Sequence, residues 1–282
     1  MKSLKALAGF LCLGMSVLAA SHVEAGPLED RIASGQTIRI GFANEPPYGF
    51  PGDNNEPKGI VNTYVIAVLH KMGYDKVEPV VADWGGLIPG LQAGRLDIIT
   101  GGFAILGKRC ANITFSEPMM RVTNAFIVRK GNPEGIQSYK DLVRKNAVFV
   151  TGAGYGTVEN AKQEGVPEAK IMQVPGQAEI LAAVLSGRAA AGGSDYLSAR
   201  EIAKKSADGM VEVTNPDELP DKYTNYVGIG FRNDDKDFVA KFNAAQKRYL
   251  GSPEMMKAVA PYGYDEKSLP GDKTAEWLCA NR

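Results

Sequence analysis

The sequence predicts an α/β protein made of two similar halves, and three observations carry this prediction. Strand-like and helix-like hydrophobic patterns alternate through 37–100, in the order strand, helix, strand, helix, strand. A second alternation of this kind runs through 138–195, again with a glycine-bearing loop between a strand and a helix. No segment is long and polar enough to link separate domains, so strands are expected to join the halves. Because such alternation is typical of parallel sheets, each half should contain a mostly parallel sheet.

The first half is expected to begin with a strand at 37–42, where apolar and polar residues alternate. This strand leads into the turn A-N-E-P-P-Y-G-F, which places an acid and aromatic residues beyond the carboxyl end of a strand, where open α/β sheets bind ligands. Apolar residues at helical spacing predict a helix at 59–72, which Gly73 ends. Three more elements follow: a strand at 77–81, a helix at 87–93 and a strand at 96–100.

The stretch 94–118 combines features of an anion site. The strand at 96–100 ends in Gly101 and Gly102, which leave the backbone open to close approach. Arg109 follows, and its planar guanidinium matches a carboxylate in bidentate fashion. We therefore expect a small anion to bind here. The alternative is that Arg109 is an ordinary surface charge.

The second half is expected to open with a strand at 124–130 and a turn at G-N-P. The loop T-G-A-G-Y-G-T frees backbone N–H groups and places Thr157 at the start of a helix, whose positive end favours an anion. Asp195 stands at the end of a strand of small residues. The further elements are strands at 147–150, 171–174, 189–194 and 226–231, and helices at 138–144, 177–186, 235–251 and 252–260, with one more ending at 164.

Residues 1–25 are expected to be a cleaved signal peptide. Lys2 and Lys5 give it a positive start, an apolar run covers 6–20, and V-E-A offers a cleavage site, with L-A-A as a second candidate. The apolar run is too short to span a membrane as a helix. These features predict export to the periplasm.

Export changes the meaning of the cysteines. Loss of Cys12 with the signal leaves Cys110 and Cys279, and an even pair in an oxidising compartment indicates a disulfide. It would close a loop of roughly 170 residues and contribute about 4–5 kcal/mol on the chain-entropy model. The alternative is two separate buried thiols.

Composition and motifs argue against several classes of function. The 32 Lys and Arg residues balance 32 Asp and Glu residues, so no charge excess suggests a nucleic-acid partner. The sequence has no G-x-S-x-G motif, P-loop or metal-ligand cluster, so we expect neither a cofactor nor a metal. After signal removal His70 is the one histidine, and Glu45 is the one candidate general acid. An enzyme, and an exported sensory or structural domain, are the alternatives to a binding protein.

Taken together, the motifs resemble the solute-binding proteins of ABC importers for polar amino acids (family 3). The resemblance covers nearly all of 35–265, and its motifs are E-P-P-Y, W-G-G-L-I-P-G-L-Q-A-G-R-L-D-I-I, K-R-C, F-S-E-P, the loop to Thr157, G-R-A-A-A-G-G-S-D and P-Y-G. Within this family the A-N-E-P-P turn, the R-C pair and the late cysteine are most similar to the ectoine and hydroxyectoine binders.

The resemblance implies a two-lobed periplasmic binding protein fold (type II), in which two doubly wound lobes are joined by two crossing strands. The lobes would be 26–126 plus 225–282, and 127–224. A monomer would bind a zwitterionic, amino-acid-like solute such as ectoine or hydroxyectoine in the cleft and pass it to the membrane permease. A polar or basic amino acid is the alternative ligand, and a dehydratase-like enzyme on the same fold is a further one.

The resemblance also assigns roles to charged and polar residues. Arg109 and Thr157 would hold the ligand carboxylate from opposite lobes. Asp195 takes the position that grips the ammonium in amino-acid binders, and Glu45 would face the positive end of an ectoine-like ligand. In a closed cleft the ligand loses its water, so each of its charges needs a fixed partner. The alternatives are that Asp195 and Thr157 only cap helices and that Glu45 is a solvated acid of the turn.

Aromatic residues complete the implied site. Tyr48 and Trp84 would sandwich a cationic or flat ring through their π faces, and Phe103 would contact the ligand, unless these residues belong to the core. The ectoine-binding branch carries a third aromatic one position after Phe103, where this chain has Ala104. That branch also tends to lack an acid at the position of Asp195 and has a smaller aromatic than Trp84. The ligand is therefore left open between the two classes.

Overall fold

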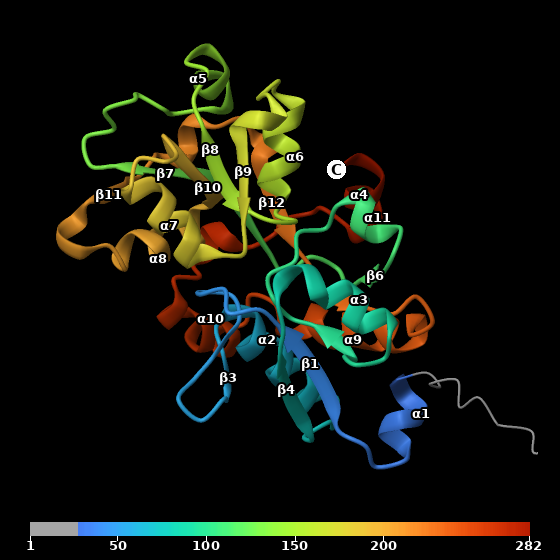
Figure 1. The fold of residues 1–282 in the computed structure, drawn as a ribbon. Coiled ribbons are helices and arrows are strands. Elements are labelled where there is room, and N and C mark those ends of the chain that lie inside the picture. The colour runs from blue at the N-terminus through green and yellow to red at the C-terminus, as the bar shows by residue number, and fades with distance from the viewer. Residues whose placement is uncertain (1–27) are drawn as a thin grey trace, which may run out of the picture.

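The computed structural model describes residues 28–282, so the predicted signal peptide lies outside the described residues. Two main sheets organise this part of the chain, and each carries helices that pack against it (Figure 1). The first sheet has the strand order β4-β1-β5-β13-β6. Its strands are β1 (Ile38–Phe42), β4 (Val77–Val81), β5 (Ile98–Ile99), β6 (Thr114–Phe115) and β13 (Gly230–Phe231). Strands β1, β4 and β5 run parallel, as the alternating pattern predicts.

The first lobe consists of the first sheet and the helices around it. Its largest core cluster lies between β1 and the helices α2, α9 and α10, and it is built from buried aromatic and branched side chains such as Phe42, Tyr64 and Phe242. The helices are α1 (Leu28–Ala33), α2 (Ile60–Lys71), α3 (Leu87–Gln92), α4 (Gly107–Cys110), α9 (Lys236–Tyr249), α10 (Pro253–Val259) and α11 (Ala275–Asn281). A small hairpin of β2 (Phe50–Pro51) and β3 (Pro57–Lys58) follows β1.

The second lobe is built on the sheet of order β11-β7-β10-β8-β9. Its strands are β7 (Met120–Arg129), β8 (Phe149–Gly152), β9 (Ile171–Val174), β10 (Ala191–Asp195) and β11 (Val211–Val213), and its helices are α5 (Tyr139–Arg144), α6 (Gly156–Gln163), α7 (Gln177–Leu185) and α8 (Tyr196–Lys204). The small residues of β10 allow close packing, because a Cβ on Gly193 would lie 2.1 Å from the ring of Phe149. The ring of Phe149 therefore packs directly against the backbone of β10, the central strand of this sheet.

Two neighbouring strands connect the lobes. Strand β7 is longer than its predicted span and starts at Met120, and β12 (Thr224–Val227) pairs with this first part in antiparallel fashion. The single return strand predicted at 226–231 was wrong. The chain forms β12 beside β7 and then β13 in the first sheet, with Gly228 and Ile229 between them. The prediction that strands join the two halves is confirmed (Figure 1).

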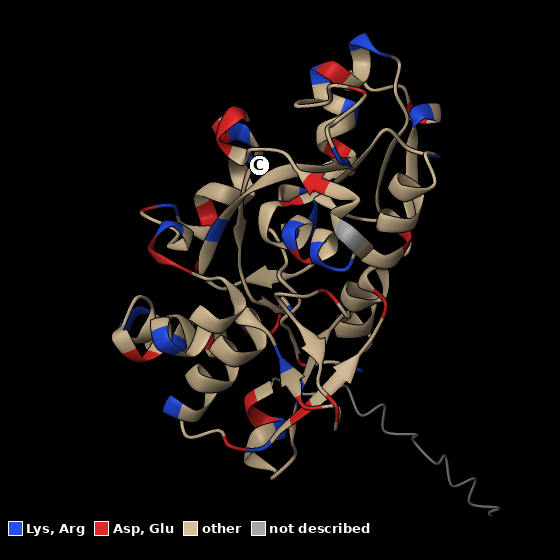
Figure 2. Ribbon diagram, turned by 90° about the vertical axis from the view of Figure 1, so that its left-hand side faces the viewer, with Lys and Arg blue, Asp and Glu red and all other residues tan. Residues whose placement is uncertain are grey.

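Charged residues of both signs are interspersed over both lobes (Figure 2), in agreement with the balanced composition. No helix within 28–282 has the length and apolar character needed to cross a membrane.

Candidate functional site

The two lobes meet around a small cavity of about 60 Å³. Residues of both lobes and of both crossing strands line it. Six of the seven predicted site residues are among them: Glu45, Tyr48, Trp84, Arg109, Thr157 and Asp195. The structure thus brings together residues that lie far apart in the sequence. The seventh, Phe103, lies behind the cavity wall.

Arg109 is a buried cation rather than a surface charge. It belongs to the short helix α4 and is only 9% exposed. Its two terminal nitrogens donate hydrogen bonds to backbone carbonyls, one to Ala104 O and one to Gly154 O, both at 2.9 Å. Burial lowers the pKa of its guanidinium to about 10. Among the described residues no carboxylate forms an ion pair with it, so this buried charge lacks an anionic partner.

Aromatic rings hold the Arg109 guanidinium in place. Its central carbon lies 4.5 Å from the ring centre of Phe103 and 5.6 Å from that of Trp84, within the range of cation–π attraction. Trp84 stacks on Phe103 with their ring centres 4.4 Å apart. Phe103 is 2% exposed and belongs to the core, whereas Trp84 is half-buried and lines the cavity. Phe103 therefore supports Trp84 and Arg109 from the side away from the cavity. Its contact with a ligand stays a prediction.

Glu45 lies in the turn after β1 and is 5% exposed, so it is not a solvated acid. Its Oε1 accepts a hydrogen bond from the hydroxyl of Tyr155, which belongs to the opposite lobe. Burial raises the pKa of Glu45 to about 7, the nearby Asp195 raises it further, and the hydrogen bonds from Tyr155 and Gln177 oppose this shift. A positive group next to Glu45 would restore its ionised form.

Asp195 caps a helix, as the alternative considered for it predicts, and its contact with a ligand stays a prediction. Its Oδ1 caps helix α8 by accepting from Ser198 N at 3.0 Å, and it also accepts from the Tyr48 hydroxyl at 2.5 Å. Both of these bonds go to the same oxygen, and the Asp195 side chain lines the cavity wall. Burial raises the pKa of Asp195.

The position of the Tyr48 ring depends on the turn at Gly101 and Gly102. Gly102 has φ of +80°, and a Cβ there would lie 2.7 Å from Cγ of Tyr48. Only glycine fits this close approach and this backbone conformation without strain. Gly102 therefore lets the Tyr48 ring settle against the loop, where it lines the cavity with 4% of its surface exposed.

Thr157 lies within the first turn of α6, as predicted, and lines the cavity. It is not the N-cap, because that position is held by Tyr155. The Thr157 hydroxyl shares a 2.5 Å hydrogen bond with the hydroxyl of Thr151, which itself donates to Gly193 O. The Thr151 hydroxyl proton is thus directed to Gly193, and Thr157 Oγ1 is fixed beside the N-terminus of the helix.

The sequence reasoning missed five polar residues of the cavity: Asn124, Tyr155, Ser194, Ser198 and Asn225. Tyr155 stands in the glycine-bearing loop, and its ring centre lies 5.2 Å from that of Trp84. Asn124 and Asn225 belong to the crossing strands β7 and β12. The glycine-bearing loop was a usable signal for Tyr155, whereas nothing in the local sequence distinguishes the two asparagines.

Direct contacts across the cleft show that the lobes are closed on each other. Trp84 Nε1 donates to Gly154 O at 3.4 Å, and Gln177 Nε2 donates to Pro46 O at 2.8 Å. At the rim, Lys108 of α4 forms a 2.8 Å ion pair with Glu159 of α6. The bonds of Arg109 to Gly154, Tyr48 to Asp195 and Tyr155 to Glu45 also join the two lobes.

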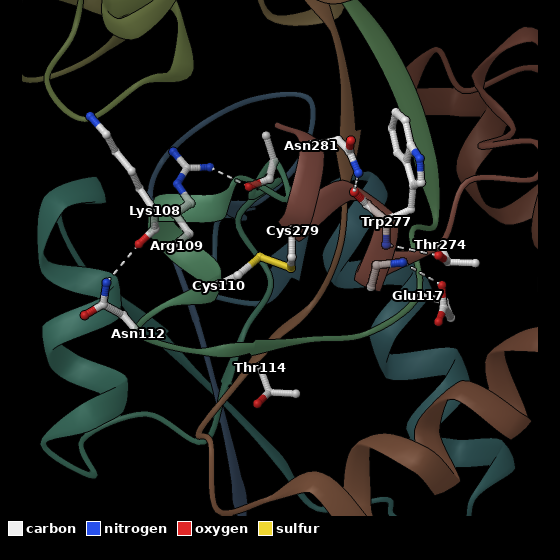
Figure 3. The surroundings of a disulfide bond; sticks show 12 residues. Lys108, Arg109, Cys110, Asn112, Thr114, Glu117, Thr274, Trp277, Cys279 and Asn281 are labelled. Carbon is white, nitrogen blue, oxygen red and sulfur yellow. Dashed lines mark hydrogen bonds between the residues drawn. A yellow bond between two sulfur atoms is a disulfide. The ribbon is translucent and has the colours of Figure 1, made fainter.

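The disulfide between Cys110 and Cys279 is present, with the two Cα atoms 5.8 Å apart, so the alternative of two separate thiols is wrong. Figure 3 shows Arg109 and Cys110 on α4 beside Cys279 on α11. The bond ties the helix that carries the buried cation to the C-terminal helix. The described residues contain no group of three or more His, Cys, Asp and Glu side chains suited to a metal ion.

A cavity between two α/β lobes, walled by a buried cation without a carboxylate partner in the described chain, one buried acid and one partly buried acid, and lined by the two connecting strands, defines a two-lobed solute-binding protein. Comparison with known proteins supports this class of protein. Residues 38–264 match the model of the bacterial extracellular solute-binding proteins, family 3, and the chain belongs to this family.

Three known proteins place the chain within the family. A probable amino-acid ABC transporter periplasmic-binding protein of Sinorhizobium fredii is 32% identical over 272 residues, which are 94% of this chain and 89% of the relative. The lysine/arginine/ornithine-binding periplasmic protein of Escherichia coli is 28% identical over 253 residues, or 86% and 90% of the two chains. The crystal structure of EhuB in complex with hydroxyectoine is 30% identical with a TM-score of 0.81, and covers 90% of this chain and 98% of EhuB.

Proposed function

We propose that this protein is the periplasmic binding component of an ABC importer and that it carries a zwitterionic, amino-acid-like solute in the cleft between its lobes. The observation that carries this proposal is the buried guanidinium of Arg109, which lacks a carboxylate partner among residues 28–282. An unpaired buried charge is costly, and a ligand carboxylate removes that cost. The names of the relatives support the transport role.

The opposite charge of the ligand faces the acids. Glu45 and Asp195 both line the cavity, and each accepts a hydrogen bond from a neutral tyrosine hydroxyl of the opposite lobe. Tyr48, Trp84 and Tyr155 provide aromatic surface beside them. A ligand with one carboxylate and a delocalised cation, as in ectoine or hydroxyectoine, matches this set, and the likeness to EhuB supports this class.

A basic amino acid is the second candidate, because two acids face one cation. With Glu45 and Asp195 both ionised, the charges of the site sum to one negative unit, which a ligand of net charge +1 neutralises. The likeness to the lysine/arginine/ornithine-binding protein supports this candidate. Asp195→Asn separates the two classes: it should weaken binding of a basic amino acid much more than binding of ectoine.

The lobes we expect to move are 26–126 with 225–282 and 127–224, with β7 and β12 as hinges. The protein acts as a monomer that meets the permease transiently, and its signal at 1–25 is removed on export. We expect no catalytic activity. The dehydratase-like alternative would use Glu45 as general acid, and turnover of a bound candidate solute, detected by mass spectrometry, would establish it.

The experiment that tests the proposal is a thermal-shift screen of the chain 26–282. The compounds are ectoine, hydroxyectoine, the common amino acids and several betaines. A solute that binds only the native state raises the melting temperature by mass action. We expect a shift with ectoines or with basic amino acids, and hits are confirmed by calorimetry. The absence of a shift with every compound would reject the proposed ligand class.

A further inference from the structure

The floor of the cavity is formed by the two crossing strands. Val122 and Asn124 of β7 and Asn225 and Val227 of β12 all line it. In the antiparallel pair Asn225 lies opposite Val122. Two asparagines on an otherwise apolar floor must each satisfy several donors and acceptors, since buried polar groups without partners are costly.

A chain of hydrogen bonds fixes the orientation of these amides. Asn124 Nδ2 donates to the hydroxyl of Tyr139 at 3.1 Å, and both residues are 1% exposed. Asn225 Nδ2 then donates to Asn124 Oδ1 at 2.6 Å. The chain therefore runs from the core of the second lobe to the cavity, and it ends on Asn225 Oδ1. No donor among the described residues reaches this oxygen.

Two observations bear on the place of the free oxygen. Asn124, to which Asn225 is bonded, is the direct partner of Asp195 in the antiparallel pair of β7 and β10. On its other side, Asn225 Oδ1 lies 3.8 Å from the position that a Cβ on Gly156 would take, at the start of α6. The oxygen thus lies beside the start of α6, and one hydrogen bond links its amide to the strand partner of Asp195.

We infer that Asn225 is a specificity-determining residue of this site: its Oδ1 accepts an N–H of the cationic group of the ligand and so selects N–H cations over quaternary ammonium groups. The inference rests on the proposed function. The carboxylates of Glu45 and Asp195 attract any cation, because Coulomb attraction needs no proton. A neutral amide oxygen is stabilised by a hydrogen-bond donor. A quaternary ammonium group has no N–H, so if it covers this oxygen, the oxygen is left without a hydrogen bond.

The test is calorimetry on the chain 26–282, with ectoine and L-arginine as N–H ligands and glycine betaine as the quaternary probe. Asn225→Ala should weaken the N–H ligand that the wild type binds by about tenfold or more, the effect of losing one hydrogen bond to a charged donor. The affinity for glycine betaine should stay within about twofold or rise. Asn225→Ser, which keeps a small polar residue on β12, should show the same selective loss and guards against misfolding of the alanine variant.

Thr224→Val is the matched control on the same strand. Thr224 makes a 2.9 Å hydrogen bond to Thr123 in the hinge and does not line the cavity, so its loss should leave all affinities within about twofold. Unchanged affinity in Asn225→Ala and Asn225→Ser overturns the inference. An equal loss for all ligands, shared by Thr224→Val, also overturns it, because that result marks a purely structural role. Failure of the wild type to bind any probe rejects the proposed function itself, which is a distinct result.

Discussion

The hydroxyl of Tyr48 donates to Oδ1 of Asp195 at 2.5 Å across the cleft. A second hydrogen bond crosses the cleft in the other direction: the hydroxyl of Tyr155 in the second lobe donates to Glu45 in the first lobe. Each acid of the cavity is thus bonded to a tyrosine from the other lobe. Because a tyrosine hydroxyl is a neutral donor, it stabilises the acid less than a cationic ligand does. The closed cleft is therefore held by bonds that a ligand can supplement.

Removal of the Tyr155 hydroxyl should shift the ligand-free protein toward an open cleft. Tyr155→Phe deletes a hydrogen bond that joins Glu45 to the other lobe. We expect a larger radius of gyration in small-angle X-ray scattering without ligand, and an unchanged radius at saturating ligand. Tyr74→Phe is the control, since Tyr74 packs against Phe238 in the first lobe, away from the cleft. Identical ligand-free scattering of Tyr155→Phe and the wild type would show that this bond does not hold the lobes together.

Arg109 should dominate the affinity. Arg109→Ala leaves a ligand carboxylate unpaired in a closed site, which costs about 3–5 kcal/mol, or more than a hundredfold in Kd. Lys108→Ala is the matched control on the same helix, because the Lys108 side chain is 75% exposed and its ion pair with Glu159 is screened by water. Calorimetry with the best ligand of the thermal-shift screen measures both variants. Wild-type affinity in Arg109→Ala would mean that the carboxylate binds elsewhere.

Glu45 should make the stability of the ligand-free protein depend on pH. Its pKa rises from 4.5 to about 7 on folding, so the native state binds more protons than the unfolded state between these values. The free energy of unfolding therefore falls as the pH rises from about 4.5 through 7, by about 3 kcal/mol at most. Urea unfolding between pH 4.5 and 8 measures this loss, and Glu45→Gln should remove it.

The other groups around Glu45 do not cancel this effect. Asp195 also has a raised pKa, so it acts in the same direction, but it is present in both the wild type and Glu45→Gln. Lys205 is a cation that lowers the pKa of Glu45, and its effect is smaller than that of burial. A cationic ligand favours ionised Glu45, so its affinity should increase over the range in which the ligand-free protein loses stability. Parallel pH profiles of the wild type and Glu45→Gln would contradict the assignment.

The disulfide should contribute strongly to global stability. It joins residues that are 169 positions apart, and the chain-entropy model gives about 5 kcal/mol for a loop of this size. Cys110→Ser combined with Cys279→Ser should lower the free energy of unfolding by this order in urea titrations. The reductant control is wild type in dithiothreitol, which should behave as the double variant does. A loss below about 1 kcal/mol would show that α11 packs against α4 equally well without the bond.

Much of the fold could be predicted from the sequence because local patterns and the packing of the lobes agree. The strands expected at 77–81 and 171–174 are found at these residues as β4 and β9. The segment 226–231 could not be assigned correctly, since its apolar residues fit one strand as well as two. Pairing with β7 in one part and with β5 and β6 in the other divides it, and such pairing is a tertiary property.

The candidate site was predictable where it is built from loops at strand ends. Glu45, Arg109, Thr157 and Asp195 follow strands or open helices, so topology alone brings them to one cleft. Asn225 could not be found in this way, because a polar residue within a strand has no local signature of function. Its position in the site depends on the pairing of β12 with β7, which brings Asn225 to the wall of the cavity.

The position of β13 determines when the first lobe can be completed during synthesis. Gly230 of this strand pairs with Ile99 of β5 on one side and with Phe115 of β6 on the other. The strands from β7 to β11, by contrast, all lie within 120–213. A chain that emerges from its N-terminus thus holds every strand of the second sheet except β12 before the first sheet receives the strand that lies between β5 and β6. Until residue 231 has emerged, β5 and β6 each have an edge without its strand partner, so the first lobe begins before the second lobe but is completed after it.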